Sequence, residues 1–203
     1  MQPRVDSGYF PGMALEHAIL ITLEERPSSG YELARRFDRS VGHFWAATHQ
    51  QIYRTLKRMS EIRWVTSHEV PGEGRPLRKV YEVTDEGRDE FVRWLSENGE
   101  PAPYRQEIAV KLRGASLGSL PTLIAEFTRH RDLHAGWVAA FRRMEQRDFP
   151  DPASLTGRRL HHYLVLSGGI QSEEMLFAWC DQVVAALERE LSGTSSQSAA
   201  AAG

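Results

Sequence analysis

The sequence predicts a mainly α-helical protein that contains one small β-hairpin. Two observations lead to this fold class. Apolar residues recur at the spacing of amphipathic helices before residue 62 and after residue 105. Between residues 64 and 83 they alternate instead, and proline and glycine interrupt the alternation, which is typical of a hairpin. We therefore expect helices, then a hairpin, then helices to the end.

Three helices are expected before the hairpin. The first ends ahead of Pro27, because proline stops a helix. Ser29 and Gly30 provide a turn and a cap for the second, and Thr48 is a good N-cap for the third. The stripe of the third helix that is expected to face the core consists of Ile52, Leu56 and Met59. The expected ranges are residues 13–25, 31–38 and 49–62.

The hairpin is followed by a fourth helix. Residues 64–70 and 79–83 alternate and are rich in strand-forming side chains, while the prolines and glycines of residues 71–76 are expected to break regular structure. Thr84 then caps a helix that ends near Gly99. The expected apolar face of this helix consists of Phe91, Val92 and Leu95.

Three helices, a two-stranded hairpin and a fourth helix follow one another in the order of a winged helix-turn-helix domain. We place this domain at residues 13–99, after an N-terminal extension over residues 1–12 that we expect to be disordered. In such a domain the third helix enters the major groove of DNA. The hairpin, or wing, would meet the same duplex.

The second half of the chain shows only helical periodicity. A linker over residues 100–104 leads to a helical domain over residues 105–191, whose long and partly apolar last helix has few partners in one chain. We therefore expect a homodimer formed through these helices. Gly168 and Gly169 mark either a break or a close approach of two helix backbones. Helices are expected at residues 105–115, 120–147 and 154–191, and a disordered tail at residues 192–203.

Composition and charge favour a DNA-binding protein over other classes. The net charge of the whole chain is −2, but residues 35–79 hold ten basic residues against four acidic ones. A single cysteine, Cys180, excludes an internal disulfide and a cysteine-based zinc cluster.

Because there is no long apolar run and no signal peptide, we expect a cytoplasmic location and no membrane partner. No nucleophile elbow, phosphate loop or HExxH pattern occurs, so neither an enzyme nor a cofactor is expected.

The outward face of the third helix is the candidate surface for double-stranded DNA. Glutamine can bond to adenine and arginine to guanine, while lysine and tyrosine reach phosphates. Alone, this face is equally typical of an ordinary solvated helix. The glycine-flanked basic tip of the hairpin favours DNA, because helix and hairpin would meet one duplex. The candidates are His49, Gln50, Tyr53, Arg54 and Lys57 on the helix, and Arg75, Arg78 and Lys79 on the hairpin.

Five segments of the chain resemble, in order and spacing, the segments of one known family. They are residues 18–20 (AIL), 29–33 (SGYEL), 44–45 (FW), 51–59 (QIYRTLKRM) and 74–87 (GRPLRKVYEVTDEG). Residues 13–95 are on this basis similar to the PadR family of transcription regulators. The helical remainder resembles the subgroup related to virulence-activator regulators, in which residues such as Gly169 and Trp179 lie in a similar long last helix.

The resemblance implies a dimeric regulator, usually a repressor, that binds an inverted-repeat operator and often releases it when a small molecule binds. Carried onto this sequence, the tyrosine of the family's third helix corresponds to Tyr53, and its wing arginine and lysine to Arg78 and Lys79. One departure concerns Arg63, which stands where the family often has a glycine at the end of the third helix.

Two alternative functions remain open. His130 and His134 have the spacing of a metal-binding pair on a helix, so a metal-responsive regulator is one alternative. No carboxylate or cysteine completes an obvious site, however, and histidines on charged helices are usually solvated, so no metal is assigned. The other alternative is a winged-helix module that contacts only proteins.

A small aromatic effector is a further partner that the sequence suggests. An aromatic group in the helical half could line a pocket at a dimer interface, although core packing is the default for such residues. The group consists of Trp137, Phe141, Phe177 and Trp179.

Overall fold

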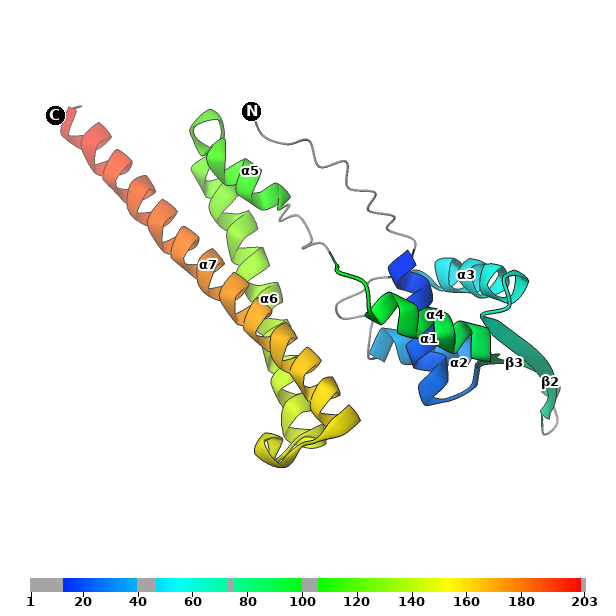
Figure 1. Cartoon of the computed structure of the whole chain (residues 1–203). Helices are drawn as coiled ribbons and strands as arrows, with labels where there is room; N and C mark the ends of the chain where they lie inside the picture. The colour runs from blue at the N-terminus through cyan, green and yellow to red at the C-terminus, as the bar shows by residue number, and fades with distance from the viewer. Residues whose placement is uncertain (1–12, 40–46, 73–74, 100–105, 202–203) are drawn as a thin grey trace. The chain divides into compact units, whose positions relative to one another are not determined.

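The computed structural model describes residues 13–39, 47–72, 75–99 and 106–201 (Figure 1). The chain divides into two compact units, residues 1–101 and residues 102–203. The predicted N-terminal extension and the predicted linker over residues 100–104 lie outside the described residues. No helix among the described residues is long and apolar enough to cross a membrane.

The first unit follows the predicted order of elements, with one short strand added. Its elements are α1 (Met13–Glu25), β1 (Ser28–Ser29), α2 (Gly30–Arg39), α3 (His49–Glu61), β2 (Val65–Gly72), β3 (Arg75–Val83) and α4 (Asp85–Leu95).

Side-chain caps begin three of these helices, as the sequence predicts. The hydroxyl of Thr48 accepts from the backbone of Gln51, whose side chain in turn accepts from the Thr48 backbone, a complete capping box. Ser29 and Glu32 make the same reciprocal pair at the start of α2. The hydroxyl of Thr84 caps α4.

The sheet has three antiparallel strands in the order β1-β3-β2, where the sequence predicted two. Ser28 and Ser29 pair with Tyr81 and Val80 of β3. The prediction that residues 71–76 lack regular structure is wrong for their described part, because β2 continues to Gly72 and β3 begins at Arg75. An irregular register between Val70 and Gly72 accommodates the proline between them, which an edge strand tolerates.

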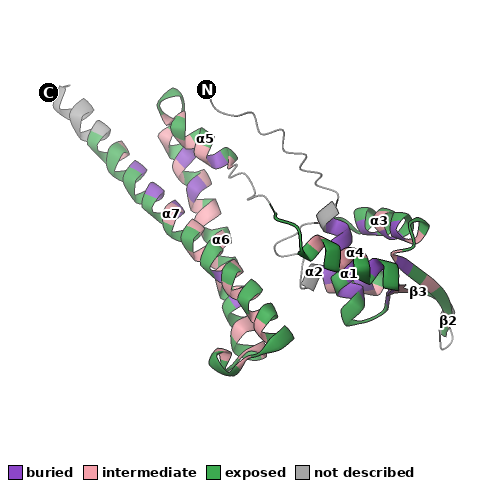
Figure 2. Cartoon of the chain, in the orientation of Figure 1, coloured by how far each residue is buried: buried purple, intermediate pink, exposed green. Residues whose placement is uncertain are grey.

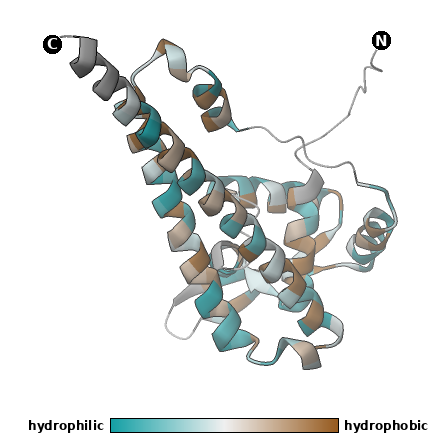
Figure 3. Ribbon diagram, turned by 90° about the vertical axis from the view of Figure 1, so that its left-hand side faces the viewer, coloured by the Kyte–Doolittle hydropathy of each residue, from teal (hydrophilic) through white to brown (hydrophobic). Residues whose placement is uncertain are grey.

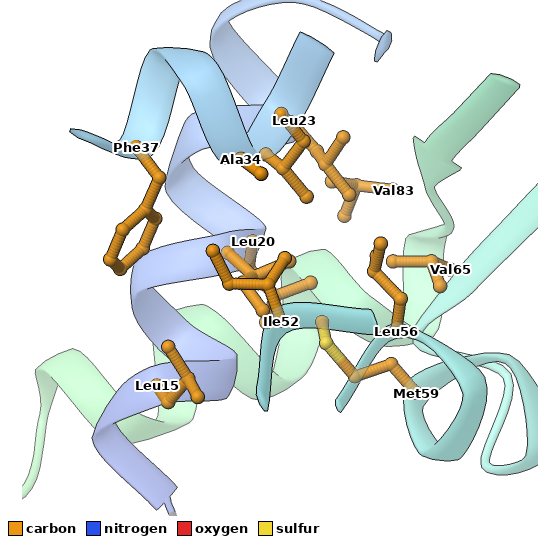
Figure 4. Close-up of a cluster of buried hydrophobic side chains, with 12 residues drawn as sticks. Leu15, Leu20, Leu23, Ala34, Phe37, Ile52, Leu56, Met59, Val65 and Val83 are labelled. Carbon is orange, nitrogen blue, oxygen red and sulfur yellow. The ribbon is translucent and has the colours of Figure 1, made fainter. Parts of the chain in front are cut away.

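The core of the first unit lies between the three N-terminal helices and the base of the sheet (Figure 4). The predicted stripe of α3 is fully buried there. It meets Leu20 and Leu23 of α1, Phe37 of α2, and Val65 and Val83 of the strands. Burial of this stripe fixes which side of α3 faces outward.

The predicted apolar face of α4 is partly wrong. Phe91 packs against the core, but Val92 and Leu95 are 62% and 63% exposed. The inward side of α4 is rotated towards Trp94, whose indole stacks on buried His17 with ring centroids 4.4 Å apart. His17 Nε2 also lies 3.1 Å from Glu90 Oε1. This polar and aromatic contact with α1 sets the orientation of α4.

Arg63 follows α3 with a φ of 63°, the left-handed region that favours glycine. This backbone conformation explains why a glycine would suit this position, where the chain has an arginine instead. The carbonyl of Arg63 accepts a hydrogen bond from the hydroxyl of Thr84 at 2.5 Å, which connects the exit of α3 to the start of α4.

The second unit is an antiparallel helical hairpin with a short helix packed on it. A buried cluster joins the three helices, and Gly169 brings α7 close to Phe141 of α6, since a Cβ on Gly169 would lie 3.4 Å from that ring. The helix is unbroken across Gly168 and Gly169, and at Gly169 it contacts a side chain of α6 rather than its backbone. The elements are α5 (Glu107–Arg113), a 3₁₀ turn (Ala115–Leu117), α6 (Leu120–Asp148), a second 3₁₀ turn (Pro152–Ser154) and α7 (Gly157–Ala201).

The end of α7 differs from the prediction. The composition predicted a disordered tail from residue 192, but the helix continues to Ala201. The alanines at residues 199–201 have the highest helix propensity of any residue, and they extend a helix whose costly nucleus already exists.

Candidate DNA interface

The outward side of α3 carries all five side chains that the sequence singled out. His49, Gln50, Tyr53, Arg54 and Lys57 are exposed, while the opposite stripe is buried (Figure 2). Neither Arg54 nor Lys57 takes part in an ion pair within the described part of the chain. These two cations are therefore available to an anionic partner.

Neighbouring polar residues of α3 have structural roles instead. Gln51 is held in the capping box with Thr48. Arg58 forms an ion pair with Glu16 of α1, whose side chain is buried. These contacts fix the rotation and the start of α3, and they leave the outward face as a separate surface.

Tyr53 rests against the first turn of α2. A Cβ on Gly30 would lie 2.4 Å from Cε1 of the Tyr53 ring, so any larger residue at position 30 would force the ring to move. The ring is 46% exposed, and its position is set by α2 as well as by α3. Sequence reasoning placed Gly30 in a turn but did not find this contact, because the two residues are 23 positions apart.

The wing extends beyond the helices of the first unit, on the side where α3 lies (Figure 1). Lys79 is exposed, with its Nζ 5.4 Å from the centroid of the Tyr81 ring on the same strand. Arg78 is half exposed and forms an ion pair with Glu32 of α2. Arg75 begins β3, but its side chain lies outside the described residues.

The four aromatic residues proposed for an effector do not form one group. Trp137 and Phe141 are neighbours on α6, whereas Trp179 of α7 packs edge-on against Phe127, with ring centroids 5.5 Å apart. Phe177 is 37% exposed. Trp137 and Phe141 are one turn apart on α6, whereas Phe177 and Trp179 are two positions apart on α7 and therefore point to different sides of that helix.

A cavity of about 500 Å³ lies between α5, α6 and α7, and of the four aromatic residues only Trp179 lines it. This cavity was not predictable from the sequence, because its walls come from three separate segments. They consist of Gln106, Glu107, Ile108, Lys111, Glu126, Arg129, His130, His134, Trp179 and Cys180.

The histidine pair in this cavity lacks the arrangement of a metal site. His134 Nδ1 lies 2.6 Å from Glu173 Oε2, whereas Nε2 of His130 lies 3.0 Å from a guanidinium nitrogen of Arg129. Burial, and then the charge of Arg129, lowers the pKa of His130. Across the described residues, no group of three histidine, cysteine or acidic side chains could hold an ion.

The fold of the first unit is that of the winged helix-turn-helix proteins, with α3 in the position of the recognition helix. The model of the Transcriptional regulator PadR-like family matches residues 19–93, and that of the Virulence activator alpha C-term matches residues 104–188. A probable transcriptional regulator of Mycobacterium tuberculosis is 48% identical over 188 residues, which cover 88% of this chain and 100% of the relative. The chain belongs to the PadR-like family of transcriptional regulators, which is not a family of enzymes.

Solved structures resemble the chain over both units. PadR of Bacillus subtilis in complex with operator DNA has a TM-score of 0.75 and 26% identity, covering 86% of this chain and 99% of PadR. The complex of PadR with p-coumaric acid has a TM-score of 0.69 and 25% identity, covering 88% and 97%. AphA, a virulence activator of Vibrio cholerae, has a TM-score of 0.73 and 28% identity, covering 87% and 99%. The predicted winged helix-turn-helix fold with a helical C-terminal region is confirmed.

Proposed function

We propose that the chain represses transcription by binding an inverted-repeat operator as a homodimer, and that a small aromatic effector releases it. The observation that carries this proposal is the outward face of α3, where Arg54 and Lys57 have no acidic partner among the described residues and lie beside Gln50 and Tyr53. In PadR of Bacillus subtilis, a negative regulator, the same fold is bound to operator DNA.

Each proposed contact has a chemical role. Gln50 and Arg54 can read base edges, because the amide of Gln50 donates one hydrogen bond and accepts another, and the guanidinium of Arg54 donates two. Tyr53 and Lys57 can hold phosphates and so set the register of the helix on the duplex. The wing would add Arg75, Arg78 and Lys79, which could contact the phosphate backbone of the DNA or enter its minor groove.

The homodimer is supported by apolar side chains that the helical unit leaves exposed. Apolar and polar residues are interspersed along α7 (Figure 3). Several of its apolar side chains are exposed. A second copy packed on this surface would cover them and would bring two recognition helices to two half-sites. On the two long helices the exposed residues are Leu133 and Trp137 of α6, and Leu164, Val165, Met175 and Phe177 of α7.

The cavity in the second unit is the place that we propose for the effector. Its volume is within the range of small-molecule sites. Ile108 and Trp179 offer apolar surface for a ring, and Lys111 and Arg129 can hold polar groups. The Oε1 atom of Gln106 is buried without a hydrogen-bond partner among the described residues, so a donor on the effector would satisfy it.

We expect Arg54→Ala to weaken operator binding by about 1 to 3 kcal/mol and to relax sequence preference at one base pair of each half-site. The measurement is fluorescence anisotropy with a duplex that the wild-type protein selects from fragmented genomic DNA. Arg189→Ala, which removes an exposed arginine from α7, is the matched control and should bind like the wild type. Unchanged affinity in Arg54→Ala would mean that α3 presents a different face to DNA.

We expect p-coumaric acid, or another member of a panel of aromatic compounds, to change the tryptophan fluorescence of the protein and to weaken its binding to the selected duplex. Trp179→Phe should remove most of the fluorescence change, because Trp179 lines the cavity. Trp137→Phe should retain it, since Trp137 is not part of the cavity wall. A panel that leaves the fluorescence unchanged would count against the effector.

A further inference from the structure

Arg78 already has an anionic partner in the free protein. Its Nη1 lies 2.6 Å from Oε1 of Glu32, and the two side chains are 50% and 44% exposed. Lys79, the next wing cation, has no such pair within the described residues. A phosphate that approaches Arg78 therefore meets a guanidinium that is already paired with the carboxylate of Glu32.

The carboxylate of Glu32 is held in place by its second oxygen. Oε2 accepts from the backbone nitrogen of Ser29 at 3.0 Å and from its hydroxyl at 2.9 Å. The bond from the Ser29 backbone, followed by that from its hydroxyl and the charge of Arg78, holds the pKa of Glu32 below its usual value against the opposing effect of burial. Glu32 is thus a fixed anion, and Arg78, on a longer side chain, is the partner that can move.

This anion lies where the elements proposed to face DNA meet. β1 joins the start of α2 to the wing strand β3, and Tyr53 of α3 rests on Gly30, two residues before Glu32. A negative charge at this point opposes a nearby phosphate unless a cation neutralises it.

We propose that Glu32 weakens sequence-independent DNA binding by competing with phosphate for Arg78. This inference rests on the proposed binding of duplex DNA. In the free protein Arg78 is paired with Glu32, and on a duplex it must exchange a carboxylate for a phosphate, so it adds less than a full phosphate contact. Weak sequence-independent binding is useful to a regulator, since the genome offers an enormous excess of competing sites.

The test is Glu32→Gln, measured as duplex affinity against salt concentration. Glutamine keeps the capping bond to Ser29, because a capping box accepts either residue. We expect affinity for a random-sequence 30-base-pair duplex to rise by about 3- to 10-fold at low salt. The slope of log affinity against log salt should steepen by up to about 0.9, the value for one full phosphate contact.

Two comparisons separate competition from a simple loss of negative charge. Glu24→Gln breaks the matched pair of Glu24 with Arg88, whose side chains are 46% and 49% exposed, and should leave duplex affinity unchanged. In an Arg78→Gln background, Glu32→Gln should no longer change the salt slope.

The inference is overturned if Glu32→Gln leaves the slope unchanged, if Glu24→Gln raises affinity equally, or if the slope change persists in the Arg78→Gln background. A wild-type chain that binds no duplex would overturn the proposed function itself. Wild-type binding with an unchanged slope in Glu32→Gln would overturn only the inference.

Discussion

A chain that carries Leu133→Glu and Met175→Glu is expected to be monomeric and to bind its selected duplex about 100-fold more weakly than the wild type, or worse. Both side chains are at least half exposed in the helical unit, so the substitutions should leave the fold of one chain intact. In the proposed dimer they would bury two unpaired carboxylates per chain, which is costly. Without the second recognition helix, the gain from two linked half-site contacts is lost.

Light scattering coupled to size-exclusion chromatography reports the oligomeric state of this variant, and anisotropy its affinity. Gln146→Glu with Gln182→Glu adds the same number of charges at exposed polar positions of α6 and α7 and serves as the control. It should remain dimeric and bind like the wild type. If the Leu133 and Met175 variant stays dimeric with full affinity, the two chains do not meet through this surface.

Gly87→Ala is expected to destabilise the winged-helix unit by about 3 kcal/mol. A Cβ at this position would lie 2.1 Å from the backbone oxygen of Trp64 and 3.1 Å from a methyl group of Val83. The backbone of Trp64 cannot shift without breaking hydrogen bonds. Its nitrogen donates to the carbonyl oxygen of Met59 at 2.9 Å, and its oxygen accepts from the backbone nitrogen of Thr84 at 3.1 Å. The substitution therefore pushes α4 away from the sheet.

Thermal unfolding followed by circular dichroism measures this effect, and the transition of the first unit should fall by about 10 to 20 °C. Gly99→Ala is the control, since a Cβ there would meet nothing within 4 Å. A Gly87→Ala transition at the wild-type temperature would show that the backbone of Trp64 can shift to admit a Cβ at position 87.

Local signals predicted most of the first unit. Pro27 and Thr48 mark helix boundaries that the structure confirms, and the stripe of Ile52, Leu56 and Met59 places the outward face of α3. These features are predictable because capping and amphipathic spacing act within a few residues.

Contacts between distant segments were not predictable in this way. The serines of β1 have no strand periodicity and form a strand only because β3 lies beside them. The rotation of α4 depends on the contact of Trp94 with His17 of α1. The ion pair of Arg78 depends on Glu32, which lies 46 residues earlier. The cavity likewise needs three helices in place before Trp179 has a pocket to line.

The most direct test of the proposed DNA interface is the affinity of the wild-type protein for its selected duplex as salt is raised. The interface predicts binding at low salt that weakens steeply, with log affinity falling by about 0.9 per unit of log salt for each phosphate held. Absence of binding to any duplex at low ionic strength would contradict it. Binding that does not change with salt concentration would also contradict the proposed interface and would favour a winged helix that contacts only proteins.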